Sequence, residues 1–318
     1  MDSHRGTSPL AAWALAAAGG LAFCMLGARL GHLDWRLDLL SHFHVQYAGL
    51  ALLGTLVSAF AGWRRIAAFG GLLTLYAGLQ VSPLVLHRDQ GQPAAGPPTR
   101  VAALNVKTSN RRFDAAAAWL DACDPDIAVL QELDAAWMAA LEAALKGHRR
   151  LPTDTARDDN FGIAVFVRSG LEHEELEVHH TAEGLPWIEA VIVGPGGPLR
   201  VFALHTVPPM SSGAHRARNR QIEDVLARAA RSAQPALALG DLNATIWSTA
   251  LRGPLARAPL RAAGLGAGLH GSWPAALRCA GGILIDHVLV DDRLVVLDHR
   301  VGPPVGSDHL GVVVEVAR

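Results

Sequence analysis

The stretch ALALGDLNAT, residues 236–245, joins an apolar run to two polar side chains. The run ALALG has no charged residue, which is typical of a strand that is covered on both faces of its sheet. Asp241 and Asn243 follow the run directly. Because an unpaired carboxylate at the mouth of a buried strand is costly, we expect Asp241 to meet a cation or hydrogen-bond donors there.

The same pattern recurs through the C-terminal part of the chain. Other apolar runs that read as strands are VAALNV (101–106), IAVLQ (127–131), GIAVFV (162–167), WIEAVIV (187–193), LRVFALH (199–205), ILIDHVLV (283–290) and LGVVVEV (310–316). The polar residues at or beside their ends are Asn105, Gln131, Glu132, His205, Asp286, His287, Ser307, Asp308 and His309. Convergence of these ends on one rim would allow the carboxylates to bind a hard cation. Oxygen ligands suit Mg²⁺, Mn²⁺ or Ca²⁺, whereas zinc would require more histidines or cysteines at fixed spacing.

Helical patterns lie between these runs, notably at 111–122, 135–146 and 214–231. An alternation of apolar strands and helices over about 220 residues is typical of an α/β domain. We therefore expect residues 101–318 to form one α/β catalytic domain.

Three apolar runs without Asp, Glu, Lys or Arg precede this domain: Gly6–Ala28, Leu39–Trp63 and Ile66–Leu86. Each is long enough to cross a bilayer, for which about 20 residues suffice. A cleaved signal peptide is the alternative for the first run. The sequence predicts a membrane anchor of three transmembrane helices over residues 1–87, followed by a Pro/Gly linker over residues 88–100.

The basic residues beside these runs indicate an orientation. Arg64 and Arg65 occupy the short loop between the second and third runs. Basic loops are retained on the cytoplasmic side, so three crossings would place the C-terminal domain outside the cytoplasm. We expect a multi-pass protein of the cell membrane.

The composition narrows the classes of partner. Half of the residues are hydrophobic and 18% are charged, and the net charge is −1. A strongly basic surface for duplex nucleic acid is therefore not expected. A phosphate-bearing substrate remains compatible, because a bound metal can supply positive charge. The three cysteines form no CxxC pair, which argues against a zinc knuckle or a disulfide framework.

Taken in order, the segments LNV, QE, HTVPP, GDLNAT, IDHVLV and GSDHLGV resemble the motifs of the endonuclease/exonuclease/phosphatase superfamily. That superfamily includes DNase I-like nucleases, abasic-site endonucleases, sphingomyelinases and inositol-polyphosphate 5-phosphatases. The resemblance covers the C-terminal two-thirds of the chain. It implies a four-layer α/β/β/α sandwich of the DNase I type and a hydrolase of phosphoesters or phosphoanhydrides that depends on Mg²⁺ or Mn²⁺.

The resemblance also implies a role for each matching residue. Asn105 and Glu132 would lie at the metal, with Glu132 as the principal carboxylate ligand. His205 would contact the scissile phosphate or assist the leaving group. Asp241 would orient or deprotonate the attacking water, and Asn243 would hold a phosphate oxygen.

The two remaining motifs complete this set. Asp308 would pair with His309 and fix its charge, so that the imidazolium stabilises negative charge in the transition state. Asp286 would steady that pair or approach the metal.

Two departures from the family's pattern stand out. The family usually has proline at the position of Gly311, so we expect a looser loop there. The segment GIAVFVR lacks a hydroxyl or aromatic residue that often contacts phosphate. The candidates to replace this contact are Lys107, Asn160, Arg216 and Arg220, of which Lys107, Arg216 and Arg220 are our candidates for substrate binding.

The resemblance does not fix the substrate. An anchor beside a near-neutral domain favours a lipid-linked or small-molecule phosphate at the membrane surface. The first alternative is an extracytoplasmic metal-dependent nuclease, which makes nucleic acid the second choice of partner. A non-catalytic phosphate-binding membrane scaffold is the alternative from another class. No protein partner is evident from the sequence.

Overall fold

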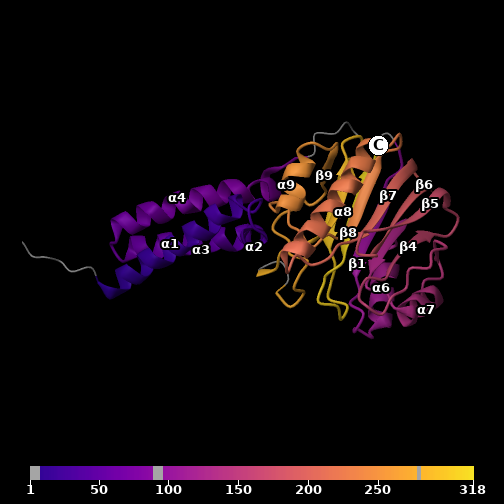
Figure 1. Ribbon diagram of the computed structural model, residues 1–318, viewed down its shortest axis with the longest axis horizontal. Coiled ribbons are helices and arrows are strands. Elements are labelled where there is room, and N and C mark those ends of the chain that lie inside the picture. The colour runs from indigo at the N-terminus through magenta and orange to yellow at the C-terminus, as the bar shows by residue number, and fades with distance from the viewer. Residues whose placement is uncertain (1–7, 89–95, 278–280) are drawn as a thin grey trace, which may run out of the picture. The chain divides into compact units, whose positions relative to one another are not determined.

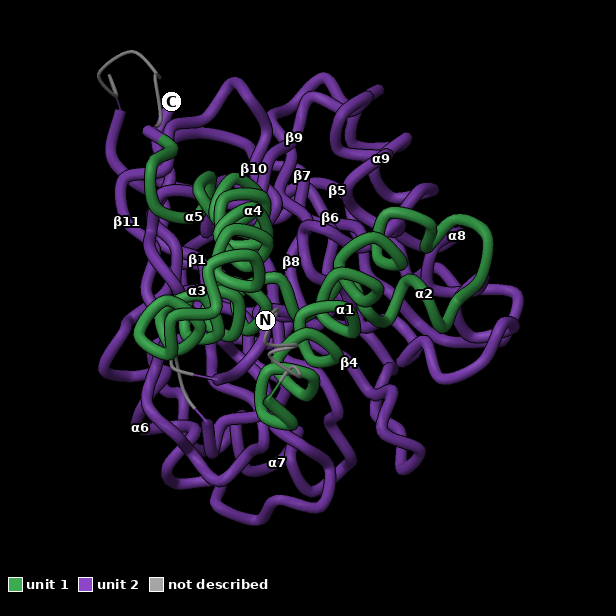
Figure 2. Tube along the Cα trace, turned by 90° about the vertical axis from the view of Figure 1, so that its left-hand side faces the viewer, with its two compact units in different colours: residues 1–87 green, residues 88–318 purple. Residues whose placement is uncertain are grey.

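The computed structural model describes residues 8–88, 96–277 and 281–318. These residues belong to two compact units, which divide the chain between His87 and Arg88 (Figure 2). Most of the predicted linker lies outside the described residues. Thr99 and Arg100, which the sequence assigned to that linker, are instead the first residues of a strand and pair with Val316 and Glu315.

The first unit is helical. Its elements are α1 (Pro9–Arg29), α2 (Trp35–Leu40), the short 3₁₀ helix η1 (Ser41–Phe43), α3 (His44–Phe60), α4 (Arg64–Val81) and α5 (Pro83–Leu86) (Figure 1). Within the described residues, two helical segments are long and apolar enough to span a bilayer: Pro9–Arg29 and Trp35–Phe60. Helix α4 begins with two arginines, which lower its mean hydropathy. Segments of this kind near an N-terminus are either membrane spans or a signal sequence.

The second unit contains two six-stranded sheets. The first has the order β11-β12-β1-β2-β4-β3 and comprises β1 (Thr99–Asn105), β2 (Ile127–Gln131), β3 (His148–Arg150), β4 (Ile163–Arg168), β11 (Val295–Val301) and β12 (Val312–Ala317). The second has the order β5-β6-β7-β8-β10-β9 and comprises β5 (Glu172–His180), β6 (Pro186–Gly194), β7 (Gly197–His205), β8 (Ala236–Asp241), β9 (Leu260–Ala262) and β10 (Asp286–Asp291).

The two sheets pack face to face between two pairs of helices. Inward side chains of both sheets form one core cluster, which includes Val101, Val129 and Leu239. The outer face of the first sheet packs against α6 (Phe113–Cys123) and α7 (Ala135–Ala144). The outer face of the second packs against α8 (Ser212–Ala230) and α9 (Thr249–Leu255) (Figure 1). The layers therefore follow the order α/β/β/α, which confirms the predicted fold.

This arrangement explains why the strands are apolar at consecutive positions. Each sheet is covered on both faces, so residues that point either way along a strand are buried. All five residues of β2 and all six of β8 are buried. In β2 and β8 the polar residues come at the strand ends, where the chain leaves the core, whereas the edge strand β5 is polar along its length.

Strand direction and register decide which ends meet. Strands β1 and β2 run parallel, with Asn105 opposite Gln131. Strands β7 and β8 also run parallel, with His205 opposite Asp241. Strand β10 is antiparallel to β8 and begins where β8 ends, so its first residue, Asp286, lies opposite Asp241.

Candidate functional site

Asp241, Asp286 and His309 form a buried cluster at this edge of the sheets. His309 Nδ1 donates to Asp286 Oδ2 at 2.9 Å, and His309 Nε2 lies 3.7 Å from Asp241 Oδ2. Oxygen and nitrogen atoms from the three side chains all lie within 4.8 Å of one another, so the two carboxylates are close enough to share a metal ion. Three segments that are distant in sequence thus meet at one point.

The environment shifts the pKa values of these groups strongly. Burial alone would lower the pKa of His309, but the carboxylates of Asp286 and Asp241 raise it to about 10. Burial raises the pKa of Asp241 to about 7, against the opposing effect of His309. At neutral pH His309 is therefore a cation, and Asp241 is poised between its two protonation states.

His205 lies at the end of β7 beside the same cluster. Its Nε2 is 3.7 Å from Asp241 Oδ2, and the ring of Phe161 lies over the imidazole with the centroids 5.1 Å apart. Burial, with the charge of His309 nearby, lowers the pKa of His205 to about 3. His205 is thus a neutral imidazole, next to the cationic one of His309.

Glu132 reaches the cluster from the first sheet. It follows β2 with a φ of 62°, and this left-handed turn ends the strand. Glu132 Oε1 accepts from Asn105 Nδ2 at 2.8 Å, and Oε2 accepts from the backbone N–H of Thr108 at 3.1 Å. Asn105 Nδ2 also donates to Asp241 Oδ2 at 3.1 Å. Asn105 therefore links the carboxylate of the first sheet to that of the second.

Asn243 is fixed by the loop that follows β8. Its backbone N–H donates to Asp241 Oδ1 at 2.9 Å, and its Nδ2 donates to the carbonyl of Thr206 at 2.8 Å. Arg218, fully buried on α8, donates to the carbonyl of Asn243 at 2.9 Å. The sequence analysis missed Arg218. The available signal was its position on the apolar face of α8, beside Ala217 and Ile222.

The expected pairing of Asp308 with His309 is wrong. The partner of His309 is Asp286, whereas Asp308 Oδ2 lies 3.4 Å from Lys107 Nζ and its side chain is partly exposed. Ser307 fixes the bend of the chain at this point. Its hydroxyl donates to the carbonyl of Asn105 at 2.7 Å and accepts from the backbone N–H of His309 at 3.0 Å. This bend directs His309 inward.

The four candidates for a further phosphate contact lie at different places in the structure and have different partners. Lys107, with a φ of 62°, reaches the site through its ion pair with Asp308. Asn160 is exposed beside Phe161, which packs on His205. Arg220 pairs with Glu183 at 3.0 Å on the exposed side of α8, and Arg216 is exposed on the same helix. The structure therefore connects Lys107 to the cluster and directs Arg220 toward another partner.

Gly311 does not loosen the terminal loop, contrary to expectation. A Cβ added at Gly311 would lie 2.2 Å from the Trp119 ring, and one at Gly302 would lie 2.5 Å from the indole nitrogen. The backbone N–H of Gly302 donates to the carbonyl of Gly311 at 2.7 Å. The two glycines make room for a large buried ring, so the loop is tightly packed.

The donor set fits a hard divalent cation. Three of the side chains at the site are carboxylates: Glu132, Asp241 and Asp286. Asp286 Oδ1 is buried and has no hydrogen-bond partner among the described residues. An unpaired buried carboxylate oxygen is costly, and a divalent cation would remove that cost.

Comparison with known proteins finds one matching family and several similar structures. The profile of the Endonuclease/Exonuclease/phosphatase family matches residues 102–309. No curated protein matches the chain. An endonuclease/exonuclease/phosphatase from Bacteroides vulgatus is similar in structure, with a TM-score of 0.59 and 16% identity over 69% of this chain and 98% of that one.

Two further structures are similar at the same level. Humanized Danio rerio TDP2 carrying 14 mutations has a TM-score of 0.57 and 17% identity, over 70% of this chain and 99% of that one. A mannosyl-6-phosphatase from Bacteroides thetaiotaomicron has a TM-score of 0.56 and 18% identity, over 69% and 100%. At these identities the structures establish the shared fold.

Proposed function

Since the chain belongs to the Endonuclease/Exonuclease/phosphatase family, we propose that it hydrolyses a phosphoester or phosphoanhydride bond of a lipid-linked or small-molecule phosphate at a membrane surface, with Mg²⁺ or Mn²⁺. Hydrolysis of phosphoesters with a divalent metal is the chemistry of this family. One observation supports the proposal that this chemistry is retained here. A continuous series of contacts crosses the two sheets and joins Glu132, Asn105, Asp241, His309 and Asp286.

The proposed roles follow from charge and hydrogen bonding. Asp241, whose pKa is near neutrality, accepts the proton of the attacking water. His309 stays cationic and stabilises negative charge on the phosphoryl oxygens as it grows. Neutral His205 donates a hydrogen bond to the leaving oxygen or a phosphate oxygen, and Asn243 holds another phosphate oxygen.

Glu132 and Asp286 are the residues we propose to hold the cation, and Asn105 orients the carboxylate of Glu132 toward it. When bound, a divalent cation polarises a phosphoryl oxygen and offsets charge on the leaving group. Lys107 and Asp308 lie at the exposed side of the cluster, where Lys107 would contact substrate phosphate.

The membrane setting is part of the same proposal. Residues 1–87 would form a multi-pass anchor, with residues 101–318 as the catalytic domain outside the cytoplasm. The two long apolar segments support a membrane anchor. The orientation rests on the cytoplasmic preference of Arg64 and Arg65 and on a third crossing by residues 66–86. A site tethered near a bilayer favours a lipid-linked phosphate.

The proposal is tested with the full-length protein in phosphatidylcholine vesicles. We expect hydrolysis of bis-p-nitrophenyl phosphate with Mg²⁺ or Mn²⁺ and its loss in EDTA. Asp241→Asn should lower kcat at least about 100-fold, whereas the control Asp121→Asn, on the exposed side of α6, should not.

A second assay compares substrates under the same conditions. We expect a polyprenyl pyrophosphate to be cleaved with a higher kcat/KM than plasmid DNA or single-stranded DNA. Cleavage of DNA alone would reject the lipid-linked substrate and establish the nuclease. Full activity of Asp241→Asn would reject the catalytic roles.

A further inference from the structure

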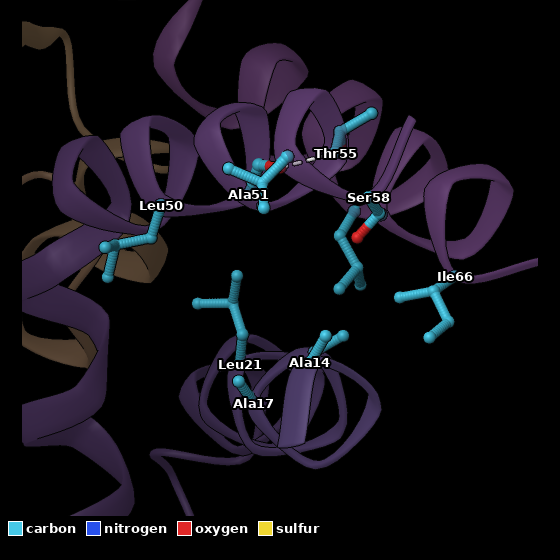
Figure 3. A pocket seen from close by; sticks show the side chains of 13 residues that line it. Ala14, Ala17, Leu21, Leu50, Ala51, Thr55, Ser58 and Ile66 are labelled. Carbon is cyan, nitrogen blue, oxygen red and sulfur yellow. Dashed lines mark hydrogen bonds between the residues drawn. The ribbon is translucent and has the colours of Figure 1, made fainter. Parts of the chain in front are cut away.

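The N-terminal unit is packed tightly in one half and open in the other. In the packed half, Met25 of α1, Tyr47 of α3 and Ala77 of α4 are buried against one another. In the other half, a cavity of about 240 Å³ lies between the same three helices. Figure 3 shows Ala14 and Leu21 of α1 facing Leu50 of α3 across this space.

The sizes of the facing residues explain the cavity. Helices α3 and α4 already touch, because a Cβ added at Gly70 would lie 2.6 Å from Thr55 Oγ1. Helix α1 contributes mainly alanine to the same space, including Ala14 and Ala18. Methyl groups cannot fill the gap to α3 and α4, so helix α1 packs against them farther along, where Met25, Leu21 and Cys24 belong to one apolar cluster.

The lining of the cavity suits hydrocarbon. None of the described residues that line it is charged. The hydroxyl of Thr55 donates to the carbonyl of Ala51 at 2.7 Å, within its own helix. Leu50 and Val57, which line the cavity, are exposed, so the cavity opens to the surroundings of the helices. Because smaller apolar cavities of about 150 Å³ already bind benzene, this space accepts part of an alkyl chain. Leu53 and Leu72, on the outer surface of α3 and α4, are exposed, as expected for helices surrounded by lipid.

Charged and aromatic residues mark one end of the cavity. Arg64 and Arg65 are both exposed and directly precede Ile66, which lines the cavity. Trp63 lies beside Arg64 in sequence, and Trp13 lies beside Ala14. Tryptophan is enriched at the level of lipid headgroups, and paired arginines attract anionic headgroups.

We propose that this cavity binds one acyl chain of an anionic phospholipid, whose phosphate lies against Arg64 and Arg65. The acyl chain would fill the space that the small alanine side chains of α1 leave between the helices. This site is separate from the hydrolytic cluster and rests on the proposed membrane anchor, not on which phosphate bond that cluster cleaves.

The test uses electron paramagnetic resonance of the full-length protein in phosphatidylcholine nanodiscs. The probes are phosphatidylglycerol and phosphatidylcholine, each spin-labelled near the end of one acyl chain. We expect a motionally restricted component with roughly tenfold preference for phosphatidylglycerol, in line with the contribution of two arginines. Ala18→Phe, which fills the cavity, should remove that component, and the milder Ala14→Leu should reduce it.

Matched variants test the cavity and the pair of arginines separately. Ala16→Phe adds the same ring to an exposed position of α1 that does not line the cavity, and should leave the restricted component unchanged. Arg64→Gln together with Arg65→Gln should retain the component and lose the preference for phosphatidylglycerol. Equal signals from Ala18→Phe and Ala16→Phe would overturn the proposal, as would equal binding of both lipids to the unmodified protein. Crosslinked dimers that disappear in Ala18→Phe would also overturn it, since a second copy would then fill the cavity.

Discussion

His309 is held by a carboxylate that its own sequence motif does not contain. The family resemblance implies a pairing of Asp308 with His309, yet Asp286 on β10 makes the 2.9 Å hydrogen bond. The direction of a side chain in a bend depends on local hydrogen bonds such as those of Ser307, which residue types alone do not reveal. The presence of both residues at one edge was predictable; their pairing was not.

This difference gives a prediction at the residue scale. Asp286→Asn should lower kcat at least about 100-fold, because His309 loses the charge that keeps it cationic and the proposed cation loses a ligand. Asp308→Asn, which breaks only the ion pair with Lys107, should lower kcat less than about tenfold. Steady-state kinetics on bis-p-nitrophenyl phosphate would measure both. An equal loss in the two variants would contradict the assignment.

The pH dependence of hydrolysis follows from the same two groups. Activity should rise as pH increases through about 7, where Asp241 loses its proton. It should fall as pH increases through about 10, where His309 loses its charge. Profiles of kcat/KM for bis-p-nitrophenyl phosphate would measure both limits. A profile that stays flat from pH 6 to 8 would contradict the role of Asp241.

At the scale of single elements, the strand ends were the predictable part of the site. Apolar runs ended by Asn105, Glu132 and His205 imply buried strands, and parallel pairing then brings those ends to one edge. Arg218 was not predicted, because its role depends on how α8 lies over the loop at Asn243. The packing of Gly311 was not predicted either, because Trp119 comes from a helix nearly two hundred residues away.

The terminal loop provides a stability prediction. Gly311→Ala should lower the free energy of unfolding by about 1–3 kcal/mol, because the added methyl would overlap the Trp119 ring. Gly147→Ala, where a Cβ would meet no atom within 4 Å, is the matched control. Denaturant unfolding followed by circular dichroism would measure the change. Recovery of part of the loss in Gly311→Ala combined with Trp119→Leu would confirm the cause.

Strand β11 provides a second stability prediction. Burial, with His270 and His287 nearby, lowers the pKa of His299 to about 4. Because the folded protein favours the neutral ring, stability should fall as pH drops below about 6.5 and level off below about 4. The loss should be about 2 kcal/mol, less than the full shift implies since the ring is partly exposed. His299→Gln should flatten this dependence in denaturant unfolding, whereas His180→Gln, exposed on β5, should not.

At the scale of the whole molecule, the pattern of strands and helices predicted an α/β domain, and the family resemblance of the six motifs predicted the sandwich. Six motifs in sequence order imply strands that must share one edge, and the two sheets supply that edge. The order of strands within each sheet was not predictable, since it depends on long-range pairing such as that of β1 with β12. The number of membrane spans and their orientation stay predictions, with two segments of sufficient length and hydropathy in the described residues.

The account depends on Glu132 and Asp286, which are distant in sequence, binding one divalent cation. Calorimetric titration of the full-length protein with Mn²⁺ measures that most directly. We expect saturable binding that is lost in Glu132→Gln and Asp286→Asn and retained in Glu223→Gln, an exposed glutamate of α8. Unchanged binding in the first two variants, or no binding to the unmodified protein, would contradict the account.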